Sequence, residues 1–385
     1  MGKKVILKDV ATLLNGRAYK QDELLDSGKY PVLRVGNFFS NRGWFYSDLE
    51  LEDEKYCDNG DLLFAWSASF GPKIWDGGKV IFHYHIWKIL TTPQIDKKYF
   101  YYFLENAADR IKESGHGIAM IHTTKSEMEQ MELLLPEMEQ QLQIATVLDK
   151  VSELINLRKE QLAKLHELVK ARFVEMFGDP ASNPMGWPKM SMHQAIDKGI
   201  IEKPLDGNHG EKHPKTSDYV SAGIPFIMAN NLVDGSVDLE NCAFITKEQA
   251  DSLDKGFAHD GDVLLTHKGT IGRTAVLHTT YPYIMLTPQV TYYRPIHGLI
   301  PEFLKGYFDT EYFQGIIGNI ASIGSTRAYI GITAQQELPL IVPPIEKQKS
   351  YATFVEQTNK TKLTIQASLD KLEVMKKALM QEYFG

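Results

Sequence analysis

Cysteine is scarce in this chain of 385 residues. The two cysteines, Cys57 and Cys242, have no neighbours at metal-ligand spacing, which argues against a disulfide framework or a structural zinc site and fits a reducing cytoplasm. Long apolar runs are also missing, so no segment reaches the length of a transmembrane helix. The N-terminus, MGKKVILKDV, is too short and too polar for a signal peptide. We expect a cytoplasmic protein without a membrane span.

Sequence motifs of nucleotide-dependent catalysis are absent as well. There is no phosphate-binding loop that ends in Gly-Lys-Ser or Gly-Lys-Thr, and the glycine-spaced segment 267–272 lacks the required order. No Asn/Asp-Pro-Pro-Tyr/Phe sequence of the kind used by adenine methyltransferases occurs. These absences favour a non-enzyme over an autonomous nuclease or methyltransferase.

An excess of positive charge is also missing, because the formal net charge is −7. Acids and bases balance in segment 139–177, whereas segment 346–384 carries two more bases than acids, which leaves −9 for the remainder. If the remainder binds DNA, its basic residues must gather on one face, or a partner must supply much of the phosphate contact.

A long stretch of the sequence occurs twice. Residues 135–178 align without a gap with residues 342–385 at an offset of 207 positions, and thirteen of the 44 aligned pairs are identical. A repeat of this length indicates a chain built from two equivalent halves.

Each copy of the repeat predicts one long helix. After a proline-containing turn, each runs for about 40 residues without glycine or proline. The first copy has a 4-3-4-3 spacing, which is typical of a coiled-coil seam, and a helix of about 38 residues would be roughly 57 Å long. The alternative is two ordinary amphipathic helices in two separate cores, which the length and the heptad spacing oppose. The seam of the first copy is Ile144, Leu148, Val151, Ile155, Arg158, Leu162, Leu165, Val169, Arg172 and Met176.

The segments before the two long helices also correspond. Short strand-like runs alternate with turns in both, and the sequence from Gly60 to Phe64 is matched by that from Gly261 to Leu265. Predicted helices at 97–113 and 301–317 correspond too. We predict an α+β fold with two similar domains joined by two long helices that form an antiparallel coiled coil with a pseudo-twofold axis. The predicted parts are head 1 (residues 1–134), a central helix (135–178), a linker (179–186), head 2 (187–341) and a C-terminal helix (342–385).

This organisation resembles the specificity subunit of type I restriction-modification systems over nearly the whole chain. The resemblance is carried by the duplicated helices, each preceded by a hydrophobic-proline step, and by two loop sequences in head 2. These loops are GDVLLTHKGTIGR at 261–273 and GSTRAYI at 324–330. Head 1 departs from both, with Trp-Ser-Ala-Ser at 66–69 and His-Gly at 116–117. Such departures are expected if the two heads read different sequences.

The resemblance implies a non-catalytic subunit that recognises a bipartite target on double-stranded DNA. Equivalent faces of duplex DNA recur about every 34–36 Å, which suits two half-sites separated by an unread gap. The implied protein partners are two DNA adenine methyltransferase subunits, bound through the helices, and restriction and translocase subunits in the full restriction enzyme. No cofactor is expected in this chain, since S-adenosylmethionine and ATP with magnesium belong to those partners. Without the resemblance, the alternative is a coiled-coil scaffold with two protein-binding heads.

Candidate DNA contacts are polar or basic residues on loops that could reach a groove. Arginine and lysine suit guanine or phosphate, and asparagine and glutamine suit adenine. The alternative for the asparagines is that they hold turns at strand ends, and a phosphate contact competes with base reading for Lys268 and Arg327. The candidates in head 1 are Arg34, Asn37, Trp66, Ser67, Lys73 and His116. The candidates in head 2 are Asn230, Asn231, His267, Lys268, Arg273, Ser325, Thr326 and Arg327.

Two histidines in head 1, His83 and His85, raise the question of a metal site. Histidines at i and i+2 share one face of a strand, but no third ligand is evident and the repeat places Gln289 opposite His85. We favour a polar or DNA-facing role over metal binding.

The helices provide candidate partner-binding residues. Leu154, Leu157 and Leu168 would remain exposed on a two-helix bundle and would suit a protein partner. Basic residues interrupt each seam, and they would either lie with long aliphatic stems at the bundle edge or fix the register and face a partner. These residues are Arg158, Arg172, Lys362 and Lys376.

Overall fold

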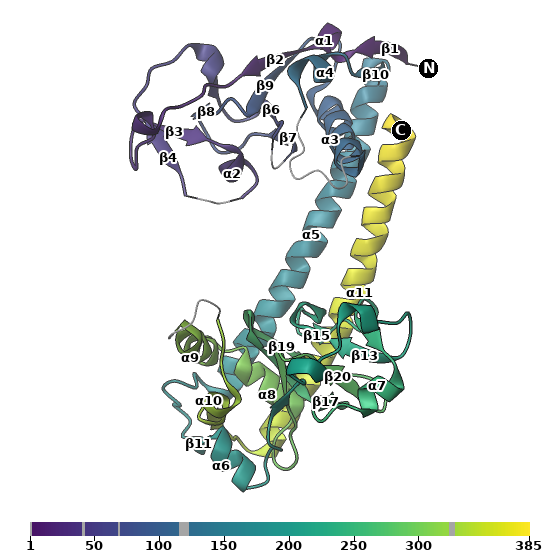
Figure 1. The fold of residues 1–385 in the computed structure, drawn as a ribbon. Coiled ribbons are helices and arrows are strands. Elements are labelled where there is room, and N and C mark those ends of the chain that lie inside the picture. The colour runs from purple at the N-terminus through teal and green to yellow at the C-terminus, as the bar shows by residue number, and fades with distance from the viewer. Residues whose placement is uncertain (1, 41–42, 68–69, 115–122, 323–327) are drawn as a thin grey trace. The chain divides into compact units, whose positions relative to one another are not determined.

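The computed structural model describes residues 2–40, 43–67, 70–114, 123–322 and 328–385. The chain forms two compact units (Figure 1). Unit 1 comprises Met1–Lys159 and Ala367–Gly385, and unit 2 comprises Glu160–Gln366. Each unit therefore combines one head with one end of each long helix.

Unit 1 contains two four-stranded sheets and a two-stranded one. One sheet has the order β2-β9-β6-β7 and is antiparallel throughout; the other has the order β4-β3-β8-β5, in which β3 and β8 run parallel. Strand β1 pairs with β10, so the first and last strands of head 1 lie side by side. The strands are β1 (Lys3–Ile6), β2 (Ala11–Asn15), β3 (Tyr30–Leu33), β4 (Phe45–Ser47), β5 (Tyr56–Cys57), β6 (Leu62–Ala65), β7 (Gly71–Ile74), β8 (Val80–Phe82), β9 (Ile86–Thr91) and β10 (Glu132–Leu135). The helices of head 1 are α1 (Leu7–Val10), η1 (Gln21–Glu23), α2 (Val35–Phe38), η2 (Asp53–Lys55), α3 (Lys97–Ser114) and α4 (Lys125–Glu129).

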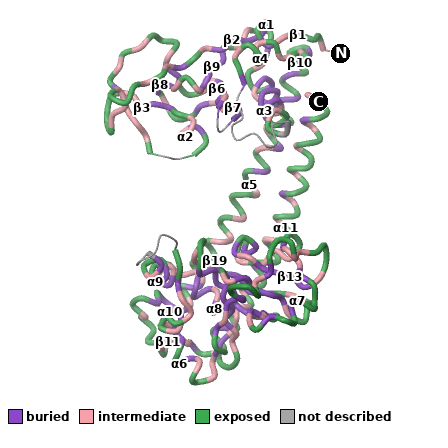
Figure 2. The backbone as a smooth tube through the Cα atoms, viewed as in Figure 1, coloured by how far each residue is buried: buried purple, intermediate pink, exposed green. Residues whose placement is uncertain are grey.

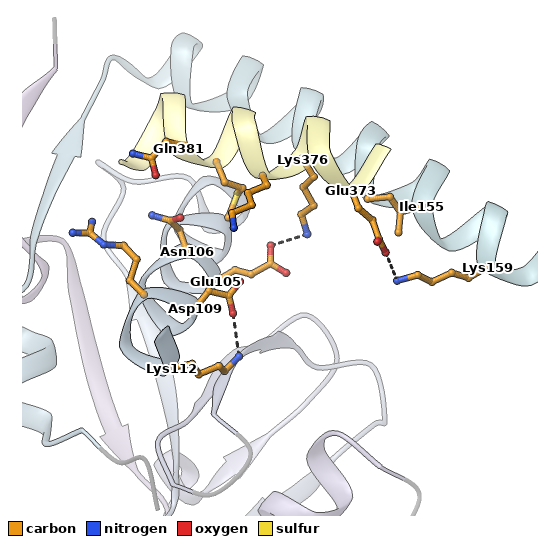
Figure 3. Close-up of a pocket in the computed structure, with 12 residues that line it drawn as sticks. Glu105, Asn106, Asp109, Lys112, Ile155, Lys159, Glu373, Lys376 and Gln381 are labelled. Atoms are coloured by element: carbon orange, nitrogen blue, oxygen red, sulfur yellow. Dashed lines mark hydrogen bonds and ion pairs between the residues drawn. The ribbon is translucent and has the colours of Figure 1, made fainter. Parts of the chain in front are cut away.

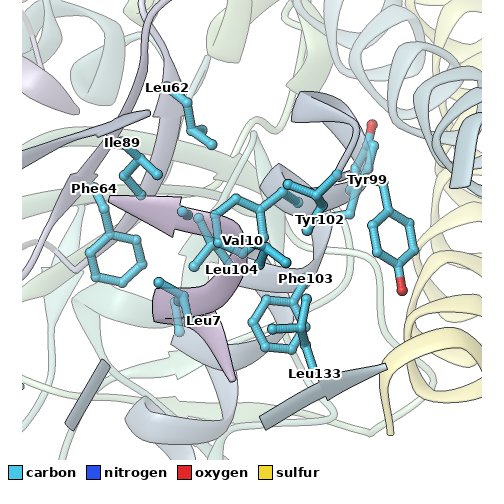
Figure 4. Packing of buried hydrophobic residues seen from close by; sticks show 14 of the residues in the cluster. Leu7, Val10, Leu62, Phe64, Ile89, Tyr99, Tyr102, Phe103, Leu104 and Leu133 are labelled. Carbon is cyan, nitrogen blue, oxygen red and sulfur yellow. The ribbon is translucent and has the colours of Figure 1, made fainter. Parts of the chain in front are cut away.

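The main core of unit 1 lies between the β2-β9-β6-β7 sheet and α3. Aromatic residues of α3, among them Tyr99 and Phe103, pack with Leu62 and Phe64 of β6 (Figure 4). The same core includes Leu148 from the first long helix, so burial of apolar surface holds the helix against head 1.

Unit 2 repeats this plan. Its sheets have the orders β12-β21-β18-β19 and β16-β13-β20-β17, with two additional strand pairs, β11-β22 and β14-β15. The strands are β11 (Lys189–Ser191), β12 (Leu205–Asp206), β13 (Ile224–Ile227), β14 (Leu232–Val233), β15 (Ser236–Val237), β16 (Ala243–Ile245), β17 (Phe257–Ala258), β18 (Val263–Lys268), β19 (Thr270–Val276), β20 (Ile284–Leu286), β21 (Val290–Tyr293) and β22 (Pro339–Ile341). The helices of head 2 are α6 (Met192–Asp197), η3 (Gly210–Lys212), η4 (Thr216–Asp218), η5 (Ala229–Asn231), α7 (Lys247–Asp251), α8 (Pro301–Phe308), α9 (Glu311–Ser322) and α10 (Ile332–Gln336).

The pairing of the strands confirms the duplicated α+β fold. In unit 1, β6 pairs antiparallel with β9 and β3 pairs parallel with β8. In unit 2, β18 pairs antiparallel with β21 and β13 pairs parallel with β20 in the same way. The repeat thus extends beyond the helices to the order and direction of the strands in both heads.

The prediction of one continuous helix at 301–317 is wrong. The expected helix 301–317 is divided into α8 and α9. Thr310 lies at the division, where its hydroxyl donates to the carbonyl of Tyr307 and accepts from the amide of Phe313. A threonine that caps a helix in this way starts a new helix, and it has no counterpart in continuous α3.

The two long helices are α5 (Met138–Phe177) and α11 (Ile345–Phe384). In unit 1 the first part of α5 packs with the last part of α11, since Leu148 and Met380 belong to one core. In unit 2 the end of α5 packs with the start of α11, where the rings of Phe173 and Tyr351 lie 5.5 Å apart. Further along the helices, Arg158 contacts Ser368 in unit 1 and Arg172 lies beside Phe354 in unit 2. Residue numbers thus rise along α5 where they fall along α11, so the helices are antiparallel in each unit. Many of their other residues are exposed (Figure 2).

Candidate nucleic-acid interface

In unit 2 the hairpin of β18 and β19 carries Lys268, an exposed residue and the strongest candidate for a DNA contact. It is the last residue of β18, and its ammonium lies 6.0 Å from the ring centroid of Tyr329, which is 44% exposed. The neighbouring backbone is held by hydrogen bonds from Gly269 to Ala328 and from Ile330 to His267. Lys268 therefore projects from a fixed strand end beside the segment that follows residue 327. The candidates Ser325, Thr326 and Arg327 lie outside the described residues.

Two other candidates in head 2 lie in the interior. The side chain of Asn231 is 3% exposed, and its Oδ1 accepts from the amide of Met228 at the start of η5. His267 has no exposed surface, and its Nδ1 lies 2.8 Å from Oγ1 of Thr291. Neither side chain is available to DNA in this conformation, so we leave both out of the candidate surface.

Asn230 and Arg273 remain on the outside of head 2. Asn230 is exposed within η5. The guanidinium of Arg273 lies 3.5 Å from the carbonyl oxygen of Ala229 and 3.4 Å from that of Leu232, so it also supports the η5 segment. Arg273 therefore supports the backbone of η5 and is also exposed, so it stays a candidate for a DNA contact.

The burial of His267 has a consequence for pH dependence. Burial lowers its pKa to about 4, although nearby Asp206 raises it, and His209, Lys268 and Lys255 contribute to the lowering. In the unfolded chain the same histidine has the ordinary pKa of about 6.5. Between these values the unfolded state binds a proton that the folded state excludes, so stability falls as the pH falls through this window.

We expect the free energy of unfolding of unit 2 to be about 2 kcal/mol lower at pH 5 than at pH 7.5 on account of His267. The variant His267→Gln should lose this part of the pH dependence, as measured by chemical denaturation at both pH values. The matched variant His297→Gln changes an exposed histidine and should retain it. Equal pH dependence in all three proteins would contradict the assignment.

In unit 1 the candidates occupy different surroundings. Arg34 is exposed, and its guanidinium lies 5.2 Å from the ring centroid of Phe45. Trp66 is half-buried and packs against the core, with Nε1 donating to the carbonyl of Tyr84 at 2.8 Å. Trp66 thus has a packing role in addition to its partial exposure.

The remaining described candidates of head 1 are either nearly buried or already engaged in contacts within the head. Asn37 in α2 donates to the carbonyl of Gly43 at 3.1 Å, which is a turn-holding contact. Ser67 is only 9% exposed. Lys73 forms an ion pair with Asp76 at 3.4 Å and lies 5.2 Å from the ring centroid of Trp75. His116 lies outside the described residues.

A charged groove of about 490 Å³ lies among α3, α5 and α11 in unit 1. Figure 3 shows Lys376 of α11 reaching Glu105 of α3, and the two charged groups are 2.8 Å apart. Lys159 of α5 pairs with Glu373 of α11 at 2.9 Å. The charged residues named here are therefore paired with one another. The ion pair of Lys376 with Glu105 links α11 to head 1.

Two other basic residues of the seam, Arg158 and Arg172, also have contacts within their own unit. Nε of Arg158 donates to Oγ of Ser368 at 3.2 Å. Arg172 pairs with Glu175 at 2.8 Å and lies 5.6 Å from the ring centroid of Phe354. Lys362 is half-buried, and burial, followed by the charge of Lys305, lowers its pKa. These contacts fit the interpretation that the seam cations help to hold the helices, and they leave partner binding untested.

Within the described ranges, no group of three or more histidine, cysteine, aspartate or glutamate residues could hold a metal ion. In the same ranges, no helix is long and apolar enough to cross a membrane.

The comparison with protein families is decisive. The model of the type I restriction modification DNA specificity domain matches residues 3–167 and 198–374, and so covers both heads and most of both long helices. The chain belongs to this family. It is a specificity subunit of a type I restriction-modification system, a DNA-recognition component with no catalytic role of its own.

Two curated relatives in this family match over most of their length. The type I restriction enzyme EcoBI specificity subunit of Escherichia coli is 20% identical over 380 residues, covering 92% of this chain and 78% of the relative. The MjaVIII specificity subunit of Methanocaldococcus jannaschii is 21% identical over 336 residues, covering 85% and 79%.

Two solved structures share the fold of this specificity subunit. One is the type I restriction-modification S subunit of M. genitalium, with a TM-score of 0.56, 14% identity and coverage of 100% of this chain and 96% of that chain. The other comes from a study of complex assembly and conformational transition of the type I restriction-modification system. It has a TM-score of 0.55, 16% identity and coverage of 100% and 97%.

The sequence interpretation missed a pair of buried glutamines in this specificity subunit. Gln141 donates to the carbonyls of Gln94 and Pro136 and accepts from the amide of Asp96. Gln348 makes the same three contacts in unit 2, with Gly298, Pro343 and Ile300. The two glutamines are an identical pair at the offset of 207, and that identity was the available signal.

The leucines predicted to bind a partner are exposed. In unit 1 Leu154 is 41% and Leu157 is 46% exposed, and in unit 2 Leu168 is 47% exposed. Two apolar residues of α11 are more exposed still, Val374 in unit 1 at 70% and Leu363 in unit 2 at 72%.

Proposed function

We propose that this specificity subunit recognises a bipartite target on duplex DNA, with one half-site read by each head. The observation that carries the proposal is that both heads have the same strand pairing but different side chains at corresponding positions. For example, exposed Lys268 ends β18 in head 2, where head 1 has Ser67, which is only 9% exposed. One framework that presents two sets of side chains would suit two different half-sites.

We further propose that the long helices recruit two methyltransferase subunits, one at each unit. Support comes from apolar side chains that the helices leave exposed, namely Leu154, Leu157 and Val374 in unit 1 and Leu168 and Leu363 in unit 2. Leu154 and Leu157 are three residues apart in α5, so they share one face of the helix, which suits a protein partner. In the complex, S-adenosylmethionine and ATP with magnesium would be bound by the partner subunits.

The proposed division of labour follows the predicted domains. Head 1 (1–134) and head 2 (187–341) would act as target-recognition domains, and 135–178 and 342–385 would act as spacers. The net charge of −7 is compatible with DNA binding if partner subunits add phosphate contacts.

The proposal is tested with the assembled complex of this chain and its methyltransferase subunits. Footprinting on duplex DNA should show two short protected base sequences separated by a gap of fixed length. Methylome sequencing of the host should give the same bipartite consensus. Uniform binding to all duplexes, with no consensus in the methylome, would overturn the proposal.

Lys268→Ala provides a sharper version of this test. Loss of one phosphate contact should weaken binding about tenfold at low salt and reduce the slope of log K against log salt by about 0.9. The matched variant Lys247→Ala removes an exposed lysine of α7, outside the β18–β19 hairpin, and should bind as the wild type does. Equal salt slopes for the two variants would remove Lys268 from the interface.

A further inference from the structure

One short turn is held by the same backbone contacts in both heads. It joins β8 to β9 in head 1 (residues 83–85) and β20 to β21 in head 2 (residues 287–289). The amide of the first turn residue donates to the preceding parallel strand, from His83 to Leu33 at 2.9 Å and from Thr287 to Ile227 at 3.0 Å.

Two further hydrogen bonds repeat around this turn. The first turn residue accepts from the start of the next strand, with Ile86 donating to His83 at 2.9 Å and Val290 donating to Thr287 at 3.1 Å. The carbonyl of the last turn residue accepts from the neighbouring strand end. These bonds run from Trp66 to His85 at 3.1 Å and from His267 to Gln289 at 2.9 Å.

In each head the backbone of a glycine lies against the carbonyl groups at the start of this turn. A Cβ atom on Gly16 would lie 2.4 Å from the carbonyl oxygens of Phe82 and His83, and one on Gly207 would lie 1.8 Å from the carbonyl oxygen of Leu286. No side chain fits at such distances, so both glycines are required by close backbone approach. The position of the turn backbone is therefore set in the same way in both heads.

The side chains on this shared framework differ. Head 1 has His-Tyr-His at 83–85, whereas head 2 has Thr-Pro-Gln at 287–289. The last residue of the turn lies beside the strand end that carries Trp66 and Ser67 in head 1, and His267 and Lys268 in head 2. The backbone contacts are therefore shared, whereas the side chains that the two turns expose, Tyr84 in head 1 and Gln289 in head 2, differ.

In head 1 the turn presents a compact group of rings. The ring of Tyr84, which is 39% exposed, lies 4.4 Å from that of His83 and 3.9 Å from that of His85. The ring of His85 lies 4.9 Å from that of Trp66. Burial lowers the pKa of both histidines, and the positive charge of Arg34 adds to this, so the imidazoles are neutral near pH 7. Neutral imidazole can both donate and accept a hydrogen bond.

In head 2 the turn presents an amide. Gln289 is exposed and follows half-buried Pro288, which restricts the backbone before it. Exposed Lys268 lies on the strand end next to it. A glutamine amide can pair with both N6 and N7 of adenine in the major groove, and a lysine beside it suits phosphate or guanine.

We propose that these two turns are specificity-determining elements, with Tyr84 and His85 contacting bases of one half-site and Gln289 contacting a base of the other. This inference rests on the proposed bipartite recognition of DNA and names residues outside the loops from which the other candidates come. The shared backbone framework explains how two heads of one fold acquire different targets by exchanging exposed side chains on a turn of constant geometry.

The test uses the complete complex and methylome sequencing of hosts that carry each variant. Gln289→Ala should relax the preference at one base pair of one half-site by about 10–100-fold and leave the other half-site unchanged. Gln289→Glu should shift the preference at that position towards cytosine, because a carboxylate accepts from the cytosine amino group. Tyr84→Ala and His85→Ala should each alter only the opposite half-site.

The control is Gln140→Ala, which changes an exposed glutamine of α5 outside both heads and should leave the consensus intact. Thermal unfolding of each variant establishes that it folds, and the shift in preference expected for Gln289→Glu is a gain that misfolding cannot produce. A bipartite consensus that is unchanged in all turn variants, or altered in both halves by one variant, would overturn this inference. A wild-type complex without a bipartite consensus would instead refute the proposed function.

Discussion

Phe173→Ala is expected to destabilise unit 2 by about 3–5 kcal/mol. Phe173 is 1% exposed and lies in α5, where its ring centroid is 4.9 Å from that of Phe177 and 5.5 Å from those of Phe303 and Tyr351. These rings come from α5, α8 and α11, so the truncation leaves a cavity where both long helices meet head 2. The structure around it can collapse only in part, which adds to the loss of buried apolar surface.

Differential scanning calorimetry measures this effect, because the two compact units need not unfold together. The transition of unit 2 should fall by roughly 10 °C, and that of unit 1 should change little. The neighbouring variant Val174→Ala is the control, since Val174 is 49% exposed and its truncation should change stability by less than about 0.5 kcal/mol. Similar shifts for the two variants would contradict the packing described for Phe173.

Gln348→Leu should cost unit 2 about 3 kcal/mol, and Gln141→Leu should cost unit 1 a similar amount. Each glutamine is almost fully buried and satisfies two carbonyls and one amide at the start of a long helix. Leucine has a similar size but can make none of these bonds, so three backbone groups lose their partner, with a penalty of about 1–3 kcal/mol each before relaxation and access to water.

The two glutamine variants control each other. Calorimetry should show that Gln348→Leu lowers the transition of unit 2 and that Gln141→Leu lowers the transition of unit 1. Gln140→Leu, which alters the exposed residue next to Gln141, should leave both transitions in place within about 1 °C. If Gln141→Leu and Gln140→Leu had the same effect, the buried hydrogen bonds would not be the cause.

Much of the fold follows from periodicity and repetition. The long helices could be predicted because each has about 40 residues without glycine or proline, and the first also has mostly apolar residues every 3.5 positions, a pattern compatible with little else. The division between α8 and α9 was not predictable in this way, because a single capping threonine, Thr310, ends one helix and starts the next. The helical signal on both sides of Thr310 is continuous, so only the local hydrogen bonds reveal the break.

The candidate site was less predictable than the fold. Lys268 and His267 are neighbours in one polar sequence, yet Lys268 is exposed and His267 is completely buried. Successive residues of a strand point to opposite faces, and β21 and β12, which lie on one side of β18 in its sheet, are distant from it in the sequence. Thr291 and Asp206, which lie close to the ring of His267, belong to β21 and β12.

The sequence by itself determined that this chain is a duplicated pair of α+β heads with two long helices. It also supplied the resemblance to restriction-modification specificity subunits, which the family comparison confirms. These features depend on composition, spacing and repetition, which act along the chain. The tertiary structure alone decided which polar side chains reach the surface, which glutamines seal the helix starts, and that the turns at 83–85 and 287–289 share one backbone framework. Those properties arise from contacts between residues far apart in the sequence, where local patterns carry no information about which side of a strand or helix will be covered.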